Sequence, residues 1–237
     1  MSDCRRGYLT TDEKEFNSMS QTLLRKAQKD LLYLLEQGYP IKNASTFVGN
    51  HYLLSERQRL AVVRATTTNQ IIELRQNKQI KDETICKKFV LDGLNIIITL
   101  EVALSEGTLL RCMDGTIRDL AGLRGTYRLI DKTDTAILLI GDKLKQWKCE
   151  EAIFYLDAPV SNTGRLKMRI FELLGGYPYQ TKVELVNNPD VILEKMNCVI
   201  TSDAIILNKC LGWLNMTEVI IKEIIPSVSY IDLSCPI

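Results

Sequence analysis

Short apolar segments that end at an aspartate are the feature that most restricts the fold of this 237-residue chain. They are residues 89–91 before Asp92, residues 152–156 before Asp157, and residues 198–200, which reach Asp203 through Thr201 and Ser202. A further apolar segment spans residues 183–186. Runs of this length, separated by stretches with helical spacing, are typical of buried parallel strands. The pattern predicts an α/β fold with a doubly wound, mainly parallel sheet.

Helical spacing of apolar residues predicts the remaining elements. The connecting helices are expected at residues 96–104, 136–147, 166–174 and 191–196. Before the sheet, one long helix is expected from about residue 10 to the glycine and proline at 38–40, then a short one over 41–48, then one opened by a capping box at Ser55 and Gln58. Residues 75–88 are poor in large apolar side chains and mark a boundary. We expect a small all-α domain over residues 1–80, arranged like a helix-turn-helix, and an α/β domain over residues 87–237.

Composition excludes several kinds of chemistry. The 30 basic and 29 acidic residues nearly cancel, so any nucleic-acid site must be a local patch. The seven cysteines include no C-x-x-C pair and the single histidine is His51, which argues against zinc, haem and a histidine-dependent nucleophile. Scattered cysteines in apolar segments predict reduced, buried thiols. No apolar run could span a bilayer or form a signal core, and we expect a cytoplasmic protein.

The strand-end aspartates predict a metal site. The carboxyl ends of parallel strands meet at the crevice where α/β proteins bind ligands, so we expect Asp92, Asp157 and Asp203 to converge there. Their repulsion would be relieved by Mg²⁺ or Mn²⁺, and such an ion suits the hydrolysis of a phosphodiester. For any one of these aspartates taken alone, a turn or a helix cap is the simpler explanation.

Other polar residues are candidates for the same site. Asn95 either binds a ligand, orients Asp92 or caps the helix that follows. The start of the helix after Asp157 offers Ser161, Asn162 and Arg165 to a phosphate. Residues 114–127 contain three glycines, and form either a substrate loop or a solvated surface loop. Its charged residues Arg118, Asp114 and Asp119 are further candidates, as is Glu101 in its apolar helix.

The motifs resemble those of a known superfamily. Asp92-Gly93-Leu94-Asn95 after one strand, Asp157 after another and Thr201-Ser202-Asp203 after a third look like the PIN and NYN nucleases, over residues 87–225. This resemblance implies cleavage of RNA with Mg²⁺ or Mn²⁺. Residues 204–207 lack the second acid often found downstream of the Ser-Asp motif in that superfamily. The whole chain is also similar to a family of uncharacterised archaeal and bacterial proteins, through residues 34–40, 54–59 and 159–165.

Several functional hypotheses follow. In the favoured one, a metal-dependent ribonuclease, Asp92, Asp157 and Asp203 hold the ion, Asn95 and Ser202 orient ligands, and Arg118 and Arg165 contact phosphate. The alternative is a non-catalytic module that binds RNA or a nucleotide through a degenerate PIN-like site. A phosphatase with an aspartyl nucleophile ranks lower, because residue 94 is leucine where a second acid is expected. A protein-interaction platform built on the N-terminal helices would have no affinity for RNA.

Overall fold

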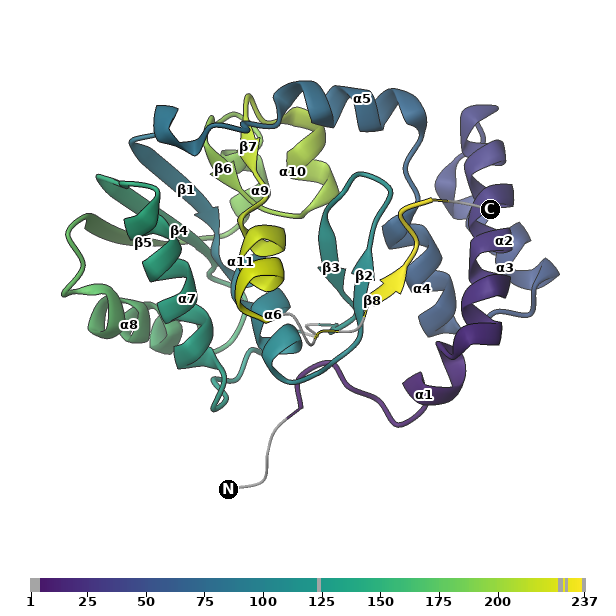
Figure 1. The fold of residues 1–237 in the computed structure, drawn as a ribbon, viewed down its shortest axis with the longest axis horizontal. Helices are drawn as coiled ribbons and strands as arrows, with labels where there is room; N and C mark the ends of the chain where they lie inside the picture. Colours follow the sequence, from purple (N-terminus) through teal and green to yellow (C-terminus); the bar gives the residue numbers. More distant parts are fainter. Residues whose placement is uncertain (1–4, 123–124, 226–227, 229, 236–237) are drawn as a thin grey trace.

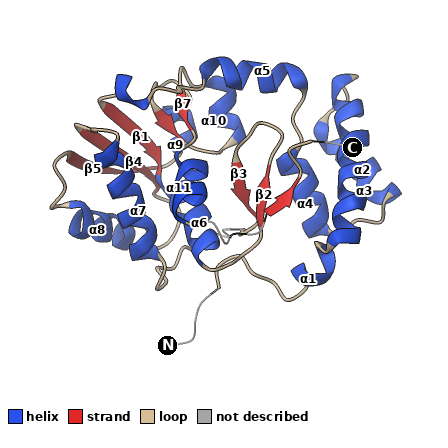
Figure 2. Ribbon diagram, viewed as in Figure 1, coloured by secondary structure: helices blue, strands red, loops and turns tan. Residues whose placement is uncertain are grey.

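A five-stranded parallel sheet forms one half of the molecule (Figures 1 and 2). The computed structural model describes residues 5–122, 125–225, 228 and 230–235. The strands lie in the order β5 (Gln180–Val186), β4 (Glu151–Asp157), β1 (Lys88–Asp92), β6 (Val199–Ile200) and β7 (Trp213–Leu214). All neighbouring pairs are parallel, and the chain is therefore an α/β protein with a mostly parallel sheet, as the sequence predicts.

Helices cover both faces of this sheet. Core residues on one face pack against α6 (Gly93–Leu104), α7 (Thr133–Gln146), α8 (Thr163–Leu174) and α11 (Met216–Ile224), and on the other against α9 (Pro189–Leu193) and α10 (Ala204–Lys209). Within β1, Phe89 and Leu91 join the first core while Val90 joins the second. Successive strand residues point to opposite faces, so a strand covered on both must be apolar throughout. In the described part of the chain no helix is long and apolar enough to cross a bilayer.

A second, smaller sheet was not expected from the sequence. It consists of β3 (Ile117–Asp119), β2 (Leu109–Arg111) and β8 (Tyr230–Asp232), in that order. Leu109 and Ile117 pack into the core of the larger sheet, whereas Leu110 and Ile231 pack against the N-terminal helices. Strands of three residues are too short to produce a readable alternation of polar and apolar positions.

The N-terminal segment is helical, but it shares its core with the second sheet. The helices are α1 (Asp12–Glu15), α2 (Ser18–Glu36), α3 (Ile41–His51), α4 (Glu56–Ala65) and α5 (Asn69–Lys78), followed by the short 3-10 helix η1 (Glu83–Ile85). The capping box of Ser55 and Gln58 is present as expected. Leu110 and Ile231 complete the apolar cluster of α2, α3 and α4, so the prediction of a separate all-α domain is not confirmed.

Residues 114–120, the first half of the expected loop, are mostly buried, whereas Gly122, Gly125 and Thr126 are exposed. Asp114, Thr116, Arg118 and Asp119 are all buried, and residues 117–119 belong to β3. Residues 123 and 124 lie outside the described part of the chain. The hairpin of β2 and β3 lies between α6 and α4, which explains its unusual density of charged residues: each must find a partner inside the protein.

A disulfide corrects the expectation that every thiol is reduced. Cys86 and Cys198 are bonded, with their Cα atoms 6.1 Å apart. They precede the adjacent parallel strands β1 and β6, and the pairing of those strands brings them within bonding range. Cys112, Cys149 and Cys210 are free and buried, as predicted. The sequence could not reveal the pair, because the two cysteines are separated by 112 positions.

The disulfide is directly testable. We expect non-reducing peptide mapping, after alkylation of free thiols, to recover a peptide that joins Cys86 to Cys198. Because the bond closes a long loop, Cys198→Ser should lower the free energy of unfolding by about 2–4 kcal/mol. Alkylation of both cysteines in the native protein before any reduction would contradict the assignment.

Candidate functional site

A pocket of about 840 Å³ lies at the carboxyl ends of the parallel strands. The chain leaves β1 toward β4 on one side, whereas β6 leads to β7 on the other, so the sheet reverses its winding between β1 and β6. Crevices at such reversals are the usual ligand sites of α/β proteins. Asp92, Asp157 and Asp203 all line this pocket, and the structure therefore brings the three strand-end aspartates to one place.

Asp92 is the most buried of these carboxylates. It ends β1 directly before α6, and Gly93 allows the start of that helix to approach β4: a Cβ at this position would lie 2.6 Å from Leu156 Cδ2. Burial raises the pKa of Asp92 to about 8, and the charges of Asp203, Asp190 and Asp157 add to the rise. The hydroxyl of Thr201, which donates to Asp92 Oδ2 at 2.8 Å, opposes it.

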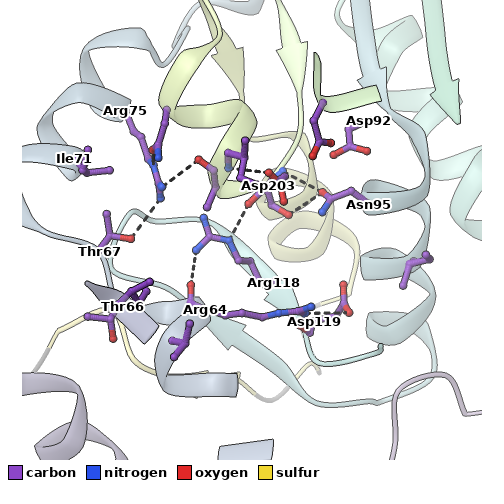
Figure 3. A pocket seen from close by; sticks show the side chains of 18 of the residues that line it. Arg64, Thr66, Thr67, Ile71, Arg75, Asp92, Asn95, Arg118, Asp119 and Asp203 are labelled. Carbon is purple, nitrogen blue, oxygen red and sulfur yellow. Dashed lines mark hydrogen bonds and ion pairs between the residues drawn. The ribbon is translucent and has the colours of Figure 1, made fainter. Parts of the chain in front are cut away.

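Asn95 connects the start of α6 to the segment that carries Asp203 (Figure 3). Its Oδ1 accepts from the backbone N–H of Ser202 at 3.1 Å and from the Ser202 hydroxyl at 2.8 Å. Asp203 caps α10, since its Oδ1 accepts from Ile205 N at 2.7 Å and from Ile206 N at 3.3 Å. These bonds hold two distant motifs in a fixed relation. Asn95 bonds Ser202, whereas Asp92 is bonded by Thr201, so the expected orientation of a ligand by Asn95 and Ser202 stays a prediction.

Asp190 is a fourth carboxylate at the pocket, and it was not among the candidates predicted from the sequence. It lies at the beginning of α9, after β5, and lines the same pocket. Burial raises its pKa, and the charges of Asp203 and Asp157 raise it further. The signal was present as Asn188-Pro189-Asp190 following an expected strand, but the aspartate stands four positions beyond the strand end, where a helix cap is the simpler interpretation.

The four aspartates give the pocket an acidic, oxygen-rich lining. The charge of Lys209 offsets part of the rise in the pKa of Asp190. For Asp92 and Asp157, no basic side chain of the described residues is among the main causes of the pKa shift. Among the residues that the structure describes, no three Cys, His, Asp or Glu side chains are grouped closely enough to hold a metal ion. The donor chemistry suits a hard divalent cation, and binding one requires the side chains to move toward it.

A buried cluster of ion pairs connects the elements that carry this lining. Asp114 is paired with Arg75 of α5 and, at 2.6 Å, with Arg118 of β3. Burial alone would raise the pKa of Asp114, but the charges of Arg118 and Arg75 and the bonds from Thr116 hold it below its ordinary value. Arg75 also donates to Asn208 Oδ1 at 2.8 Å in α10. The cluster thereby joins α5, the β2–β3 hairpin and the helix that begins at Asp203.

Arg118 does not have the role expected for it. It lines the pocket, but it donates from Nε to Ser202 O at 2.8 Å, from one terminal nitrogen to Arg64 O at 2.6 Å, and from the other to Asp114. A guanidinium with its donors engaged inside the protein positions Ser202 instead of contacting a phosphate.

Three acidic candidates have structural partners. Asp114 belongs to the buried ion cluster and does not line the pocket. Glu101 lies elsewhere, where it pairs with Arg6 and accepts from the hydroxyl of Tyr127 at 2.6 Å. Asp119 does line the pocket; its Oδ2 accepts from Thr99 at 2.8 Å and its Oδ1 from Ala121 N at 2.8 Å. Glu101 and Asp114 are therefore not part of the acidic lining.

The phosphate-binding candidates at the start of α8 do not line the pocket, although Val160 just before them does. Ser161, Asn162 and Arg165 are not among its lining residues. Ser161 N donates to Gly125 O at 3.1 Å, and Asn162 Nδ2 donates to Tyr127 O at 2.7 Å, so both hold the neighbouring loop. Arg165 is exposed. The expectation that these residues bind a phosphate at the aspartate site is not supported by their positions.

The N-terminal helices supply the opposite wall. Thr66, Thr67 and Ile71, from the junction of α4 and α5, face the aspartates across the pocket (Figure 3). Leu35, Ile41, Val63 and Thr68 also line it. This wall could not be predicted from the sequence, because apolar residues at helical spacing are indistinguishable from ordinary core positions.

Comparison with known proteins places the chain in a family. A model described as "Domain of unknown function (DUF5616)" matches residues 78–219, and one described as "Protein of unknown function (DUF434)" matches residues 23–78. The chain belongs to the DUF5616 family. It is also 35% identical over 186 residues to the "Uncharacterized protein MJ0935" of Methanocaldococcus jannaschii, covering 78% of this chain and 88% of that protein. No solved structure matches it.

These matches confirm the similarity to an uncharacterised archaeal family. The two family models meet at residue 78, where α5 ends, and the pocket is lined by residues from both of the matched regions. Neither model is a PIN or NYN family, so that resemblance stays a prediction.

The buried ion cluster yields a prediction about stability. Asp114→Asn removes the negative charge between two buried arginines, and we expect the free energy of unfolding to fall by about 3–5 kcal/mol. Glu172→Gln is the control, because Glu172 pairs with Arg169 on the surface, where the two side chains are 59% and 36% exposed. That change should cost less than about 1 kcal/mol. If urea unfolding shows that Asp114→Asn and Glu172→Gln lower the free energy of unfolding equally, then burial does not make the Asp114 ion pairs more costly to break.

The raised pKa of Asp92 yields a prediction about pH. Without metal, the folded state keeps this carboxyl protonated to about pH 8, while the unfolded chain ionises near its ordinary value of about 4. The contribution of the Asp92 carboxyl to the free energy of unfolding is therefore complete below pH 4 and is lost as the pH rises toward 8. Asp92→Asn cannot ionise, so its stability relative to the native protein should increase by about 2 kcal/mol or more between pH 5 and pH 8.

Urea unfolding in EDTA at both pH values measures this difference. Glu184→Gln, which removes an exposed acid from β5, is the control and should follow the native protein. If the stability of Asp92→Asn relative to the native protein is the same at both pH values, Asp92 is not protonated in the folded state.

Proposed function

We propose that this protein is a Mg²⁺- or Mn²⁺-dependent ribonuclease with a PIN-like α/β fold, and that it hydrolyses phosphodiester bonds at the aspartate-lined pocket. The observation that carries the proposal is the position of Asp92, Asp157, Asp190 and Asp203 around one pocket at the winding reversal of a parallel sheet. Carboxylates from separate strand ends repel one another, and a divalent cation would compensate that repulsion.

The aspartates would hold the ion between them. Bound there, the metal would supply an activated water and stabilise the charge that develops on the attacked phosphate. Asp203 would have to release at least part of its hydrogen bonding to Ile205 N and Ile206 N in order to take part. The downstream acid of the Ser-Asp motif is missing, and Asp190, at the beginning of α9, would supply an acid in its place. The two carboxylates are close enough for the charge of Asp203 to raise the pKa of Asp190.

Other side chains would prepare this site for its substrate. Asn95 fixes Ser202 through two hydrogen bonds, and Thr201 bonds Asp92, so two of the carboxylates keep their relative positions. Arg64 lines the pocket with a side chain that is 34% exposed; one of its terminal nitrogens donates to the backbone oxygen of Asp119 and lies 3.9 Å from the Asp119 carboxylate. We assign to Arg64 the contact with the substrate phosphate for which the sequence suggested Arg118.

A non-catalytic RNA- or nucleotide-binding module is the second candidate. It is favoured by one observation: no three acidic side chains are grouped as a metal site among the described residues. In this case Asp203 would keep its cap on α10, and the protein would bind its ligand without cleaving it.

Metal-dependent cleavage separates the two candidates. We expect Mn²⁺ titration with a pool of labelled RNAs to reveal cleavage by the native protein. Asp92→Asn and Asp203→Asn should each lower the rate by roughly 100-fold or more, because each removes a charged metal ligand while preserving side-chain size. The control is Glu184→Gln, an exposed acid of the same sheet. RNA binding without cleavage at any Mn²⁺ concentration would favour the binding module.

A further inference from the structure

The pocket has a second wall of a different chemical nature. Leu35, Ile41, Val63 and Ile71 line it from the N-terminal helices, and Ile205 lines it from α10, next to Asp203. Ile41 is 45% exposed and Ile205 is 52% exposed, so this surface is only partly covered by the protein itself. Partly exposed aliphatic side chains inside a concave site are typical of ligand binding.

Hydroxyl groups border this apolar wall. Thr66, Thr67 and Thr68 line the pocket between Val63 and Ile71. Thr66 donates to Val62 O at 2.6 Å, whereas the Thr68 side chain, at the start of α5, makes no capping hydrogen bond to that helix. A flat ligand lying on the aliphatic residues would therefore meet a polar group at its edge.

We propose that this wall is the base-binding subsite of the enzyme: it holds the nucleobase next to the scissile phosphate, with Ile71 at its centre. The inference rests on the proposed function and adds to it the part of the substrate that the N-terminal helices recognise. The pocket volume of about 840 Å³ is within the range of small-molecule sites, and it suits one unpaired nucleotide unit instead of a duplex.

The side chains of this wall determine how it would recognise a nucleobase. Among the described residues that line the pocket none is aromatic, so a base would contact CH groups and not stack on a ring. Contact with aliphatic side chains depends on whether a base is present more than on the hydrogen-bonding groups of that base. Thr68 is the threonine of this wall that offers its hydroxyl to the edge of a base, because the Thr66 hydroxyl bonds Val62 O and the Thr67 hydroxyl bonds Arg75. The site therefore distinguishes a nucleotide from an abasic sugar phosphate.

The experiment compares two residues of α5. Ile71 lines the pocket, whereas Leu74, three positions later on the same helix and 37% exposed, does not. The ligands are a labelled single-stranded oligoribonucleotide and a matched one whose central residues lack bases. Fluorescence anisotropy gives the affinity of the full chain for each, and Mn²⁺-dependent cleavage is measured in parallel.

We expect Ile71→Ala to weaken binding of the base-containing ligand by about 5–10-fold, because it removes methyl and methylene groups that a base would cover. Binding of the abasic ligand should change by less than about 2-fold, and Leu74→Ala should affect neither. Ile71→Val, which keeps most of the side chain, should restore most of the affinity. This selective loss would not follow from a general effect on folding.

The outcomes separate this inference from the proposed function. Equal weakening of both ligands by Ile71→Ala, no weakening of either, or no binding by the native protein would overturn the base-binding subsite. Cleavage that depends on Asp92 but not on Ile71 would retain the nuclease and reject the subsite. A selective effect of Ile71→Ala in a protein that never cleaves RNA would retain the subsite and reject hydrolysis.

Discussion

The rest of the structure depends on the ion cluster around Asp114. One buried carboxylate holds two buried arginines, and those arginines reach from α5 and β3 to the segment that carries the site. Arg118 bonds Ser202 O, while Arg75 bonds Asn208 and Ala204 O in α10. Such a cluster costs desolvation and provides little net stability compared with an apolar core, but it permits only one arrangement of its donors. That property suits a site assembled from three distant parts of the chain.

The second sheet explains why these parts act as one body. Leu110 and Ile231 face the N-terminal helices, and Leu109 and Ile117 face the core of the parallel sheet, so a thin layer of strands is shared by two apolar cores. Trp213, in the edge strand of the large sheet, donates its indole N–H to Arg75 O at 2.8 Å and fixes the end of α5. The pocket consequently has walls from both regions, and the N-terminal helices face the aspartates across it.

Prediction from the sequence succeeded where local pattern and local structure coincide. The strands β1, β4 and β6 each correspond to an apolar run, since strands covered on both faces need apolar residues at every position. The edge strand β5 includes the expected segment 183–186, in which only Val183 is buried. The polarity of parallel strands likewise places Asp92, Asp157 and Asp203 at one edge of the sheet. Prediction failed for the hairpin around Arg118, because burial of charged residues depends on partners that the neighbouring sequence does not contain.

The sequence by itself determined the α/β class, the parallel sheet, the capped helix at Ser55 and the grouping of three aspartates, because periodicity and strand polarity are local properties. Only the tertiary structure decided the roles of the charged side chains, because the role of a carboxylate or guanidinium depends on which group it contacts in the folded protein. Asp190 lines the pocket, whereas Glu101 and Arg165 do not. The wall built by Ile71 and the disulfide of Cys86 were likewise decided by chain segments that meet only after folding.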